Sequence, residues 1–130
     1  MQVITPTVDS VALRHAAHGT AERLSHSAVK ALIAEALLTP KPALVDQRGS
    51  GAHRDLDLAR LLRSAEALRG SFRSMAVQAH ASPADLTLRE QLGAIGREGE
   101  ERMLVATGGS NAHRGAIWVL GLLTAALAMR

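Results

Sequence analysis

Residues 58–79, LARLLRSAEALRGSFRSMAVQA, carry the clearest structural signal in the sequence. Apolar side chains recur there at spacings of three and four, whereas arginines take mainly the other positions. The apolar stripe consists of Leu58, Leu61, Leu62, Ala65, Leu68, Phe72, Met75, Ala76 and Ala79. This periodicity lines one face of an α-helix with apolar groups. We therefore predict a single helix of about six turns, with Asp55 as its N-cap.

The segments on both sides of this stretch also read as helices. Residues 20–38 carry an apolar stripe that includes Glu35, and Pro40 and Pro42 end that helix because each disfavours helical geometry in the preceding residue. Residues 116–129 are almost wholly apolar and predict a buried helix. No stretch alternates apolar and polar residues over a useful length, so strand signals are nearly absent. The sequence predicts an all-α fold, a helical bundle of four to six helices.

Another helix is expected after residues 82–85, SPAD, which supply capping residues and an acid for its first turn. This helix carries Gly93, Gly96 and Gly99, each of which costs about 1 kcal/mol relative to alanine in a helix interior. Glycines three apart lie along one side of a helix, where they let another helix or a ligand approach the backbone closely. The alternative is a break into two helices.

Composition and charge restrict what the chain can do. Its 130 residues give room for one domain, and we expect an N-terminal segment over residues 1–19 followed by a helical domain over residues 20–130. Thirteen arginines and two lysines face 12 acids, a net charge of +3, and guanidinium groups are well suited to phosphates. One Phe, one Trp and no Tyr provide no stacking platform for single-stranded nucleic acid. The absence of cysteine excludes disulfides and thiolate chemistry.

Location and partners follow from the same composition. The chain opens without the basic and apolar pattern of a signal peptide. The longest apolar run, residues 116–129, is shorter than the roughly 20 residues that span a bilayer. The arginines are dispersed along the predicted helices and form no continuous stripe that could contact a groove of a nucleic acid. We expect a cytoplasmic protein that has neither a membrane nor a nucleic acid as its partner.

Two short loops repeat one motif. Residues 49–54, GSGAHR, and residues 109–114, GSNAHR, match at five of six positions, and both precede an apolar helix. Free backbone N–H groups at a helix start, flexible glycines and an adjacent arginine favour bound anions. We predict that these two segments, the first and second motif loops, face a shared pocket and hold one polyphosphate. The alternative is that glycine, serine and histidine are ordinary loop and capping residues here.

Carboxylates near these loops are candidate ligands for Mg²⁺, an ion normally bound by one or two carboxylates plus substrate phosphates. The candidates are Glu35, Asp46, Asp55, Asp57, Glu98, Glu100 and Glu101. Asp57 and Glu35 fall on apolar stripes, so we expect both to face inward. A carboxylate buried among aliphatic groups is rare unless it is paired or binds a metal. The alternative is an inward acid that is paired with one of the arginines.

Four segments together resemble the triphosphoribosyl-dephospho-coenzyme A synthase family. They are residues 39–46 (TPKPALVD), 51–57 (GAHRDLD), 107–117 (TGGSNAHRGAI) and 120–123 (LGLL), in the family's order. The similarity extends over residues 28–126. Family members are substantially longer, so the resemblance implies that the chain is the N-terminal part of a larger all-helical domain.

The chain departs from the family pattern at four positions. Alanine stands at Ala43 where the family usually has glycine, and glycine stands at Gly99 where it has alanine. Serine at Ser110 replaces valine, and alanine at Ala112 replaces threonine. The last change removes a hydroxyl beside the predicted phosphate loop.

The resemblance implies a pentosyltransferase that joins the triphosphoribosyl part of ATP to the ribose 2′-hydroxyl of 3′-dephospho-CoA and releases adenine. Its product is the prosthetic-group precursor of malonate decarboxylase or citrate lyase. ATP is then a substrate and Mg²⁺ the expected cofactor. Further partners are a downstream transferase or an acyl-carrier subunit, and the chain can form a homo-oligomer.

Under this hypothesis the candidate residues are assigned to three roles, and some of them take two. The catalytic acids are Asp55, Asp57 and Glu100, with Glu35 in support, and the first three also serve as Mg²⁺ ligands. The nucleotide and phosphate groups are assigned to Lys41, Gly51, His53, Arg54, Gly109, Asn111, His113 and Arg114. The alternative function is a truncated, non-catalytic helical module that binds a nucleotide or self-associates.

Overall fold

The structure of the chain, a computed structural model, describes residues 8–130. Five α-helices follow one another in this part: α1 (Val8–Leu37), α2 (Leu58–Ala67), α3 (Arg69–Ala79), α4 (Leu86–Thr107) and α5 (Arg114–Ala128). The all-α fold predicted from the sequence is confirmed. Within residues 8–130, no helix combines the length and apolarity required to cross a bilayer.

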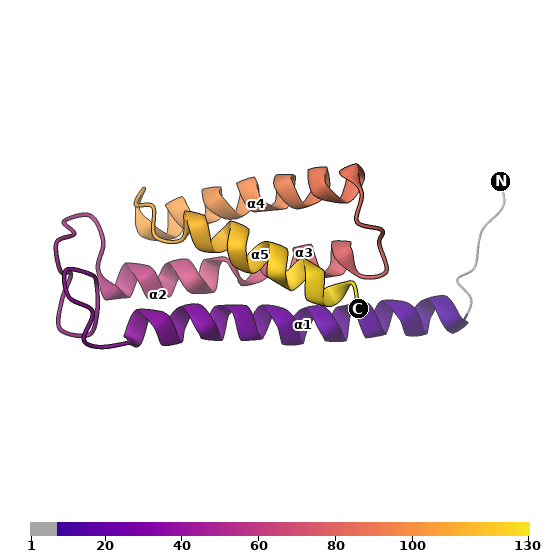
Figure 1. The fold of residues 1–130 in the computed structure, drawn as a ribbon, viewed down its shortest axis with the longest axis horizontal. Coiled ribbons are helices and arrows are strands. Elements are labelled where there is room, and N and C mark those ends of the chain that lie inside the picture. The colour runs from indigo at the N-terminus through magenta and orange to yellow at the C-terminus, as the bar shows by residue number, and fades with distance from the viewer. Residues whose placement is uncertain (1–7) are drawn as a thin grey trace.

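The helices pack side by side with alternating direction, as Figure 1 shows. α1 and α4 run one way, and α2, α3 and α5 run the other. α3 contacts each of the other four helices and forms the centre of the bundle. Phe72, Met75 and Leu68 are fully buried there and meet Met103 of α4 and Ile117 of α5. The long apolar stripe of residues 58–79 therefore organises the core.

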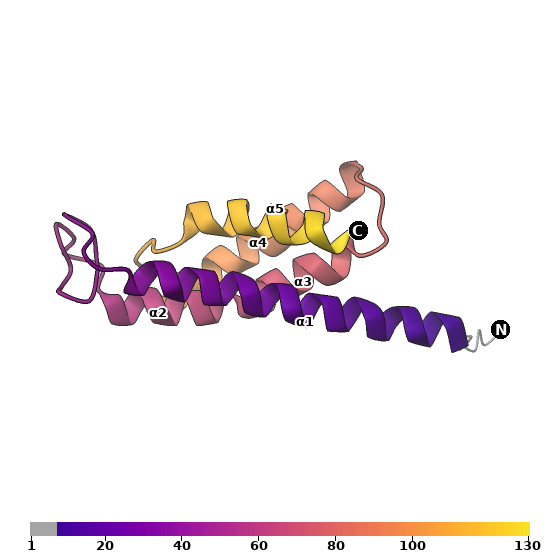
Figure 2. The same cartoon turned by 60° about the horizontal axis from the view of Figure 1, so that its bottom comes forward.

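The first helix begins earlier than predicted. α1 starts at Val8, and its N-terminal turns extend past the other helices in both views of the molecule (Figures 1 and 2). These turns lack an apolar stripe, but Ala12, Ala16 and Ala17 have the highest helix propensity of any residue type. Of the predicted N-terminal segment 1–19, residues 1–7 lie outside the described part of the chain, and the rest is helical.

The predicted six-turn helix over residues 58–79 is divided in two. α2 ends at Ala67, and Leu68 caps it, with its N–H donating to the Ala65 carbonyl at 3.3 Å; α3 begins at Arg69. Gly70 weakens the first turn of α3. Leu68 is fully buried and packs toward Gly99 of α4. The apolar pattern continues across the junction, so the spacing of apolar residues gives no sign of the break.

The glycines of α4 serve close packing, and α4 is unbroken. A Cβ at Gly96 would lie 2.6 Å from the ring of Trp118 in α5. A Cβ at Gly99 would lie 2.9 Å from Ser71 Oγ in α3. Both glycines are buried, so they admit neighbouring side chains against the backbone of α4. Of the two expectations for this helix, close approach is correct and the break is wrong.

Candidate functional site at the loop end of the bundle

Both motif loops lie at one end of the bundle. α1 and α4 end there, α2 and α5 begin there, and residues 38–57 and 108–113 make the connections (Figure 1). Ser110 Oγ of the second loop donates to the Asp55 carbonyl, which follows the first loop, at 2.5 Å. Ala112 packs against a small apolar cluster of Ala36, Val45, Leu56 and Leu61. The structure therefore brings the second loop, and the start of two helices, next to the residue that follows the first loop. The cavity beside the first loop is lined by residues 41–51 and by no residue of the second loop, so the predicted shared pocket stays a prediction.

Backbone contacts close the first loop tightly. Ala52 N–H donates to the Ala43 carbonyl at 3.0 Å, and Asp46 and Gly49 pair with each other through their backbones. Gly51 has φ +58°, and a Cβ there would lie 2.5 Å from the Ala43 carbonyl oxygen. Ala43 itself has φ +63°, a left-handed conformation that glycine adopts at much lower cost. The alanine at this position is therefore a strained departure from the family's glycine.

Lys41 anchors the end of α1. Its Nζ donates to the Glu35 carbonyl at 2.8 Å and the Ala36 carbonyl at 3.2 Å, and lies 3.4 Å from Glu35 Oε1. Carbonyls in the last turn of a helix have no partner within the helix, so these bonds satisfy them. The ammonium group predicted to bind phosphate thus already has three protein partners in this structure.

Asp46 is the buried carboxylate of this end of the molecule, with only 2% of its surface exposed. It accepts hydrogen bonds from Arg48 Nε at 2.9 Å and from the N–H groups of Lys41 and Arg48, both at 2.8 Å. The Arg48 side chain first, and then the Lys41 N–H, hold the pKa of Asp46 far below its usual range. Asp46 therefore stays ionised and fixes the loop. A cavity of about 250 Å³ lies beside it.

The second loop begins at the end of α4 and leads directly into α5. Gly108 caps α4 in a left-handed conformation with φ +68°, and Gly109 has φ +102°. Thr107 Oγ1 donates to the Ser110 carbonyl at 2.6 Å. Asn111 Oδ1 accepts the Arg114 N–H at 3.1 Å, so it caps the first turn of α5. Asn111 thus positions the helix start from which Arg114 extends.

His113 is buried, with 6% of its surface exposed. Its Nδ1 shares a hydrogen bond of 2.7 Å with Ser64 Oγ of α2, and its backbone N–H contacts Met103 Sδ. The Nε2 atom is buried and has no hydrogen-bond partner among the described residues. Burial lowers the pKa of His113, and the charge of Glu35 opposes this by raising it. The imidazole predicted to bind phosphate therefore faces the interior.

The two acids expected to face inward do not. Glu35 has 61% of its side chain exposed beside Lys41. Asp57 has 47% of its side chain exposed and is the N-cap of α2, with Oδ1 accepting the Arg60 N–H at 2.8 Å. Asp57 therefore takes the capping position predicted for Asp55. Asp57 lies four residues before Leu61, so its spacing matches that of the apolar stripe. Because it stands just before the first turn of α2, it keeps this spacing without being buried.

Each of the two loops carries charged groups that are exposed or partly exposed. Arg114 Nε lies 3.2 Å from Glu100 Oε1, which joins α5 to α4. Arg54 and His53 are exposed, and within residues 8–130 neither side chain forms a hydrogen bond or ion pair with another residue. Asp55 is exposed next to them. Among the predicted groups, Arg54, Asp55 and Arg114 are thus exposed to solvent, and Glu100 is partly exposed.

The described residues contain no cluster of three or more His, Cys, Asp or Glu side chains that would hold a metal ion on its own. Asp57 is occupied as a cap and Glu100 is paired with Arg114. Mg²⁺ that is carried by nucleotide phosphates needs only one or two protein carboxylates. The described residues therefore offer single carboxylates and no preformed metal site.

Sequence reasoning missed the roles of Ser64 and Asp46. Ser64 lies three residues after Leu61 and four before Leu68, so it stands on the buried stripe of residues 58–79. A small polar residue at a core position needs a hydrogen-bond partner, and this was the available signal for the Ser64–His113 pair. Asp46 stood among the candidate acids, but its burial depends on the fold of the loop, which periodicity does not report.

These features define a class of protein: an all-α chain in which two related loops present arginines and carboxylates at one end of a bundle. Residues 21–130 match the family described as ATP:dephospho-CoA triphosphoribosyl transferase (CitG). The chain belongs to this family. The resemblance drawn from the four sequence segments is therefore confirmed.

Curated relatives support the same assignment. A 2-(5″-triphosphoribosyl)-3′-dephosphocoenzyme-A synthase from Klebsiella pneumoniae is 58% identical over 106 residues, which are 82% of this chain and 38% of the relative. A protein named as a probable synthase of this kind in Azotobacter vinelandii is 60% identical over 110 residues, 84% of this chain and 38% of the relative. The chain thus spans well under half the length of these relatives. No solved structure matches it significantly.

Proposed function

We propose that the loop end of the bundle binds the triphosphate of ATP for transfer of its triphosphoribosyl group to 3′-dephospho-CoA, with release of adenine. The observation that carries this proposal is the meeting of two arginine-bearing loops and two helix starts at one end of the molecule. Helix N-termini and guanidinium groups both favour phosphate oxygens. Membership of the triphosphoribosyl transferase family supplies the class of substrate.

In this proposal fewer of the predicted residues contact phosphate directly. Arg54 is free to reach an anion, and Arg114 reaches one by exchanging its contact with Glu100. Lys41 and His113 act indirectly, because one anchors α1 and the other anchors the second loop to α2. Their role in binding is to hold the loops in place. Mg²⁺ would enter with the phosphates and use Asp55 or Glu100 as protein ligands.

In the proposed reaction the N-glycosidic bond of ATP breaks and a bond forms between the ribose 2′-oxygen of dephospho-CoA and the same ribosyl carbon. The hydroxyl proton is lost and the departing adenine gains one, so protons balance. Such a displacement passes through an oxocarbenium-like centre that nearby carboxylates stabilise. Asp55, Asp57 and Glu100 supply these carboxylates, and one of them accepts the hydroxyl proton. The product would serve malonate decarboxylase or citrate lyase.

Titration calorimetry with Mg-ATP tests the binding half of the proposal. Arg54→Ala should weaken ATP binding about tenfold or more, because a charge-assisted hydrogen bond contributes roughly 1.5–3 kcal/mol. Arg97→Ala is the matched control, since it removes an exposed arginine from the middle of α4. Equal affinity for the two variants, or no ATP binding by the unaltered chain, would contradict the proposal.

Adenine release, followed by chromatography with ATP and dephospho-CoA supplied, tests the chemical half. Asp57→Asn removes the negative charge and keeps an oxygen that caps α2, so folding is expected to be unaffected. A loss of turnover at unchanged stability supports a chemical role for Asp57, and unchanged turnover excludes it. ATP binding without any adenine release from the unaltered chain would favour the alternative, a non-catalytic nucleotide-binding module.

A further inference from the structure

α5 presents an apolar ridge to solvent, although a helix that is apolar on every side is normally buried. The ridge consists of Val119, Leu122, Leu123 and Leu127, which are 69%, 55%, 52% and 42% exposed. The opposite face of α5 packs into the core through Ile117, Thr124 and Ala128. The prediction of a buried helix over residues 116–129 is therefore correct for one side of α5 only.

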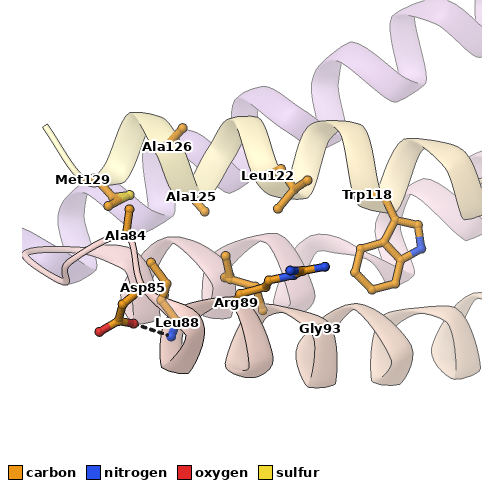
Figure 3. Close-up of a pocket in the computed structure, with 11 residues that line it drawn as sticks. Ala84, Asp85, Leu88, Arg89, Gly93, Trp118, Leu122, Ala125, Ala126 and Met129 are labelled. Carbon is orange, nitrogen blue, oxygen red and sulfur yellow. Dashed lines mark hydrogen bonds between the residues drawn. The ribbon is translucent and has the colours of Figure 1, made fainter.

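An apolar groove runs along each side of this ridge. The larger one, of about 540 Å³, lies between α5 and α4 and includes Leu88, Leu92, Trp118 and Met129. Figure 3 shows Trp118, Leu122 and Met129 of the α5 side opposite Leu88 and Arg89 of α4. The smaller groove, of about 180 Å³, lies between α5 and α1. A ridge between two grooves is the surface on which a second layer of helices packs.

The relatives are much longer than the region that this chain matches. The chain matches 38% of the Klebsiella pneumoniae relative, so more than half of that protein has no counterpart among these residues. The exposed leucines lie on the last helix of the matched region. A contiguous exposed apolar patch rimmed by polar residues is typical of an interaction site. Asp85 and Arg89 supply such a rim on the α4 side.

We infer that the α5 ridge and its two grooves form the seat for a layer of amphipathic helices that the relatives carry in the unmatched part of their chains. Leu122 lies at the centre of this seat, and Leu123 and Leu127 enter the groove beside α1. The inference rests on family membership and on the exposed face, and it holds whether or not the loop end transfers a triphosphoribosyl group. It also places the contact on a face of the bundle separate from the motif loops.

Thiol labelling tests this seat, because the chain contains no cysteine of its own. Leu122→Cys introduces one thiol on the ridge, and Val105→Cys introduces a matched one on α4, where Val105 is 84% exposed outside both grooves. Each variant is prepared as the 130-residue chain alone and joined to the unmatched part of the Klebsiella pneumoniae relative. Labelling at these two positions is read by peptide mass spectrometry.

Joining the two parts should slow labelling of Leu122→Cys about tenfold or more and leave Val105→Cys unchanged, because buried thiols are inaccessible to reagent. Equal labelling of Leu122→Cys in the two preparations would overturn the inference. Protection in the chain alone that increases with its concentration would also overturn it, since a second copy would then be the occupant. A binding measurement between the separate parts adds an independent readout, with Leu122→Asp expected to weaken affinity about tenfold or more and Val105→Asp expected to have no effect.

Discussion

The two motif loops have almost the same sequence and different surroundings. In the first loop His53 and Arg54 are exposed, and α2 begins only after Asp57. In the second loop His113 is buried against Ser64, and α5 begins at the adjacent Arg114. The same histidine-arginine pair therefore serves once as a surface group and once as the entry to a helix.

The difference comes from the residues around the motif. Thr107, Gly108 and Gly109 fold the second loop back over the end of α4, which directs His113 into the core. The first loop is closed on itself through Ala43, Asp46 and Ala52 and stays outside the core. The motif alone thus does not determine the environment of its side chains. The residues around each loop determine whether its histidine is buried and whether solvent reaches it. Substitutions at matched positions of the two loops measure this directly.

Truncation of the two histidines should give the largest contrast. His113→Ala leaves a cavity and removes the partner of buried Ser64, so we expect a loss of about 2–4 kcal/mol in the free energy of unfolding. His53→Ala removes an exposed side chain and should change stability by less than about 0.5 kcal/mol. Urea denaturation of both variants measures these values. Equal losses at the two positions would show that the loops are not as different as the structure indicates.

The first glycine of each loop provides a second matched pair. Gly109 has φ +102°, a conformation that alanine adopts only with strain, and Gly49 has no positive φ and open space around its Cβ position. Gly109→Ala should therefore destabilise the chain by about 1–2 kcal/mol, and Gly49→Ala by less than about 0.5 kcal/mol. Thermal unfolding monitored by circular dichroism distinguishes the two. A larger loss at Gly49 would contradict the backbone geometry of both loops.

Most of the fold could be predicted from hydrophobic periodicity. The stripe of residues 58–79 predicts a core helix, and the glycines of α4 predict a close approach that Gly96 and Gly99 provide. The break at Leu68 and the early start of α1 were missed for a shared reason. Periodicity reports which side of a helix is buried. It does not report where a helix without an apolar stripe begins, or where a helix is interrupted while its apolar stripe continues.

The candidate site was predicted less completely. The second loop lies next to Asp55, directly after the first loop, as the shared motif led us to expect. The roles of Arg54 and Arg114 in phosphate binding stay a prediction. The inward orientation of Asp57 and Glu35 was wrong, because a helix-capping residue and a residue of the last turn lie in register with a stripe without being covered by it. Burial of His113 and Asp46 depends on loop geometry set by hydrogen bonds between distant residues, which sequence spacing does not encode.

The pH dependence of stability should show the smallest contrast. Burial lowers the pKa of His113 below its ordinary value of 6.5, and Glu35 limits the shift. As the pH falls through 6.5, His113 binds a proton in the unfolded chain but not yet in the folded chain. The folded chain therefore becomes less stable, and this loss grows until the pH reaches the pKa of His113 in the folded chain. The stability cost of His113→Ala should therefore be greater at pH 8 than at pH 5. At each pH the unfolding free energy of the variant is subtracted from that of the unaltered chain. This subtraction largely removes the contributions of the other titrating groups, because both proteins share them. A constant cost would mean that the pKa of His113 is the same in the folded and unfolded chain, and a cost that rises toward acid pH would mean that folding raises it. Either result would contradict the buried environment of His113.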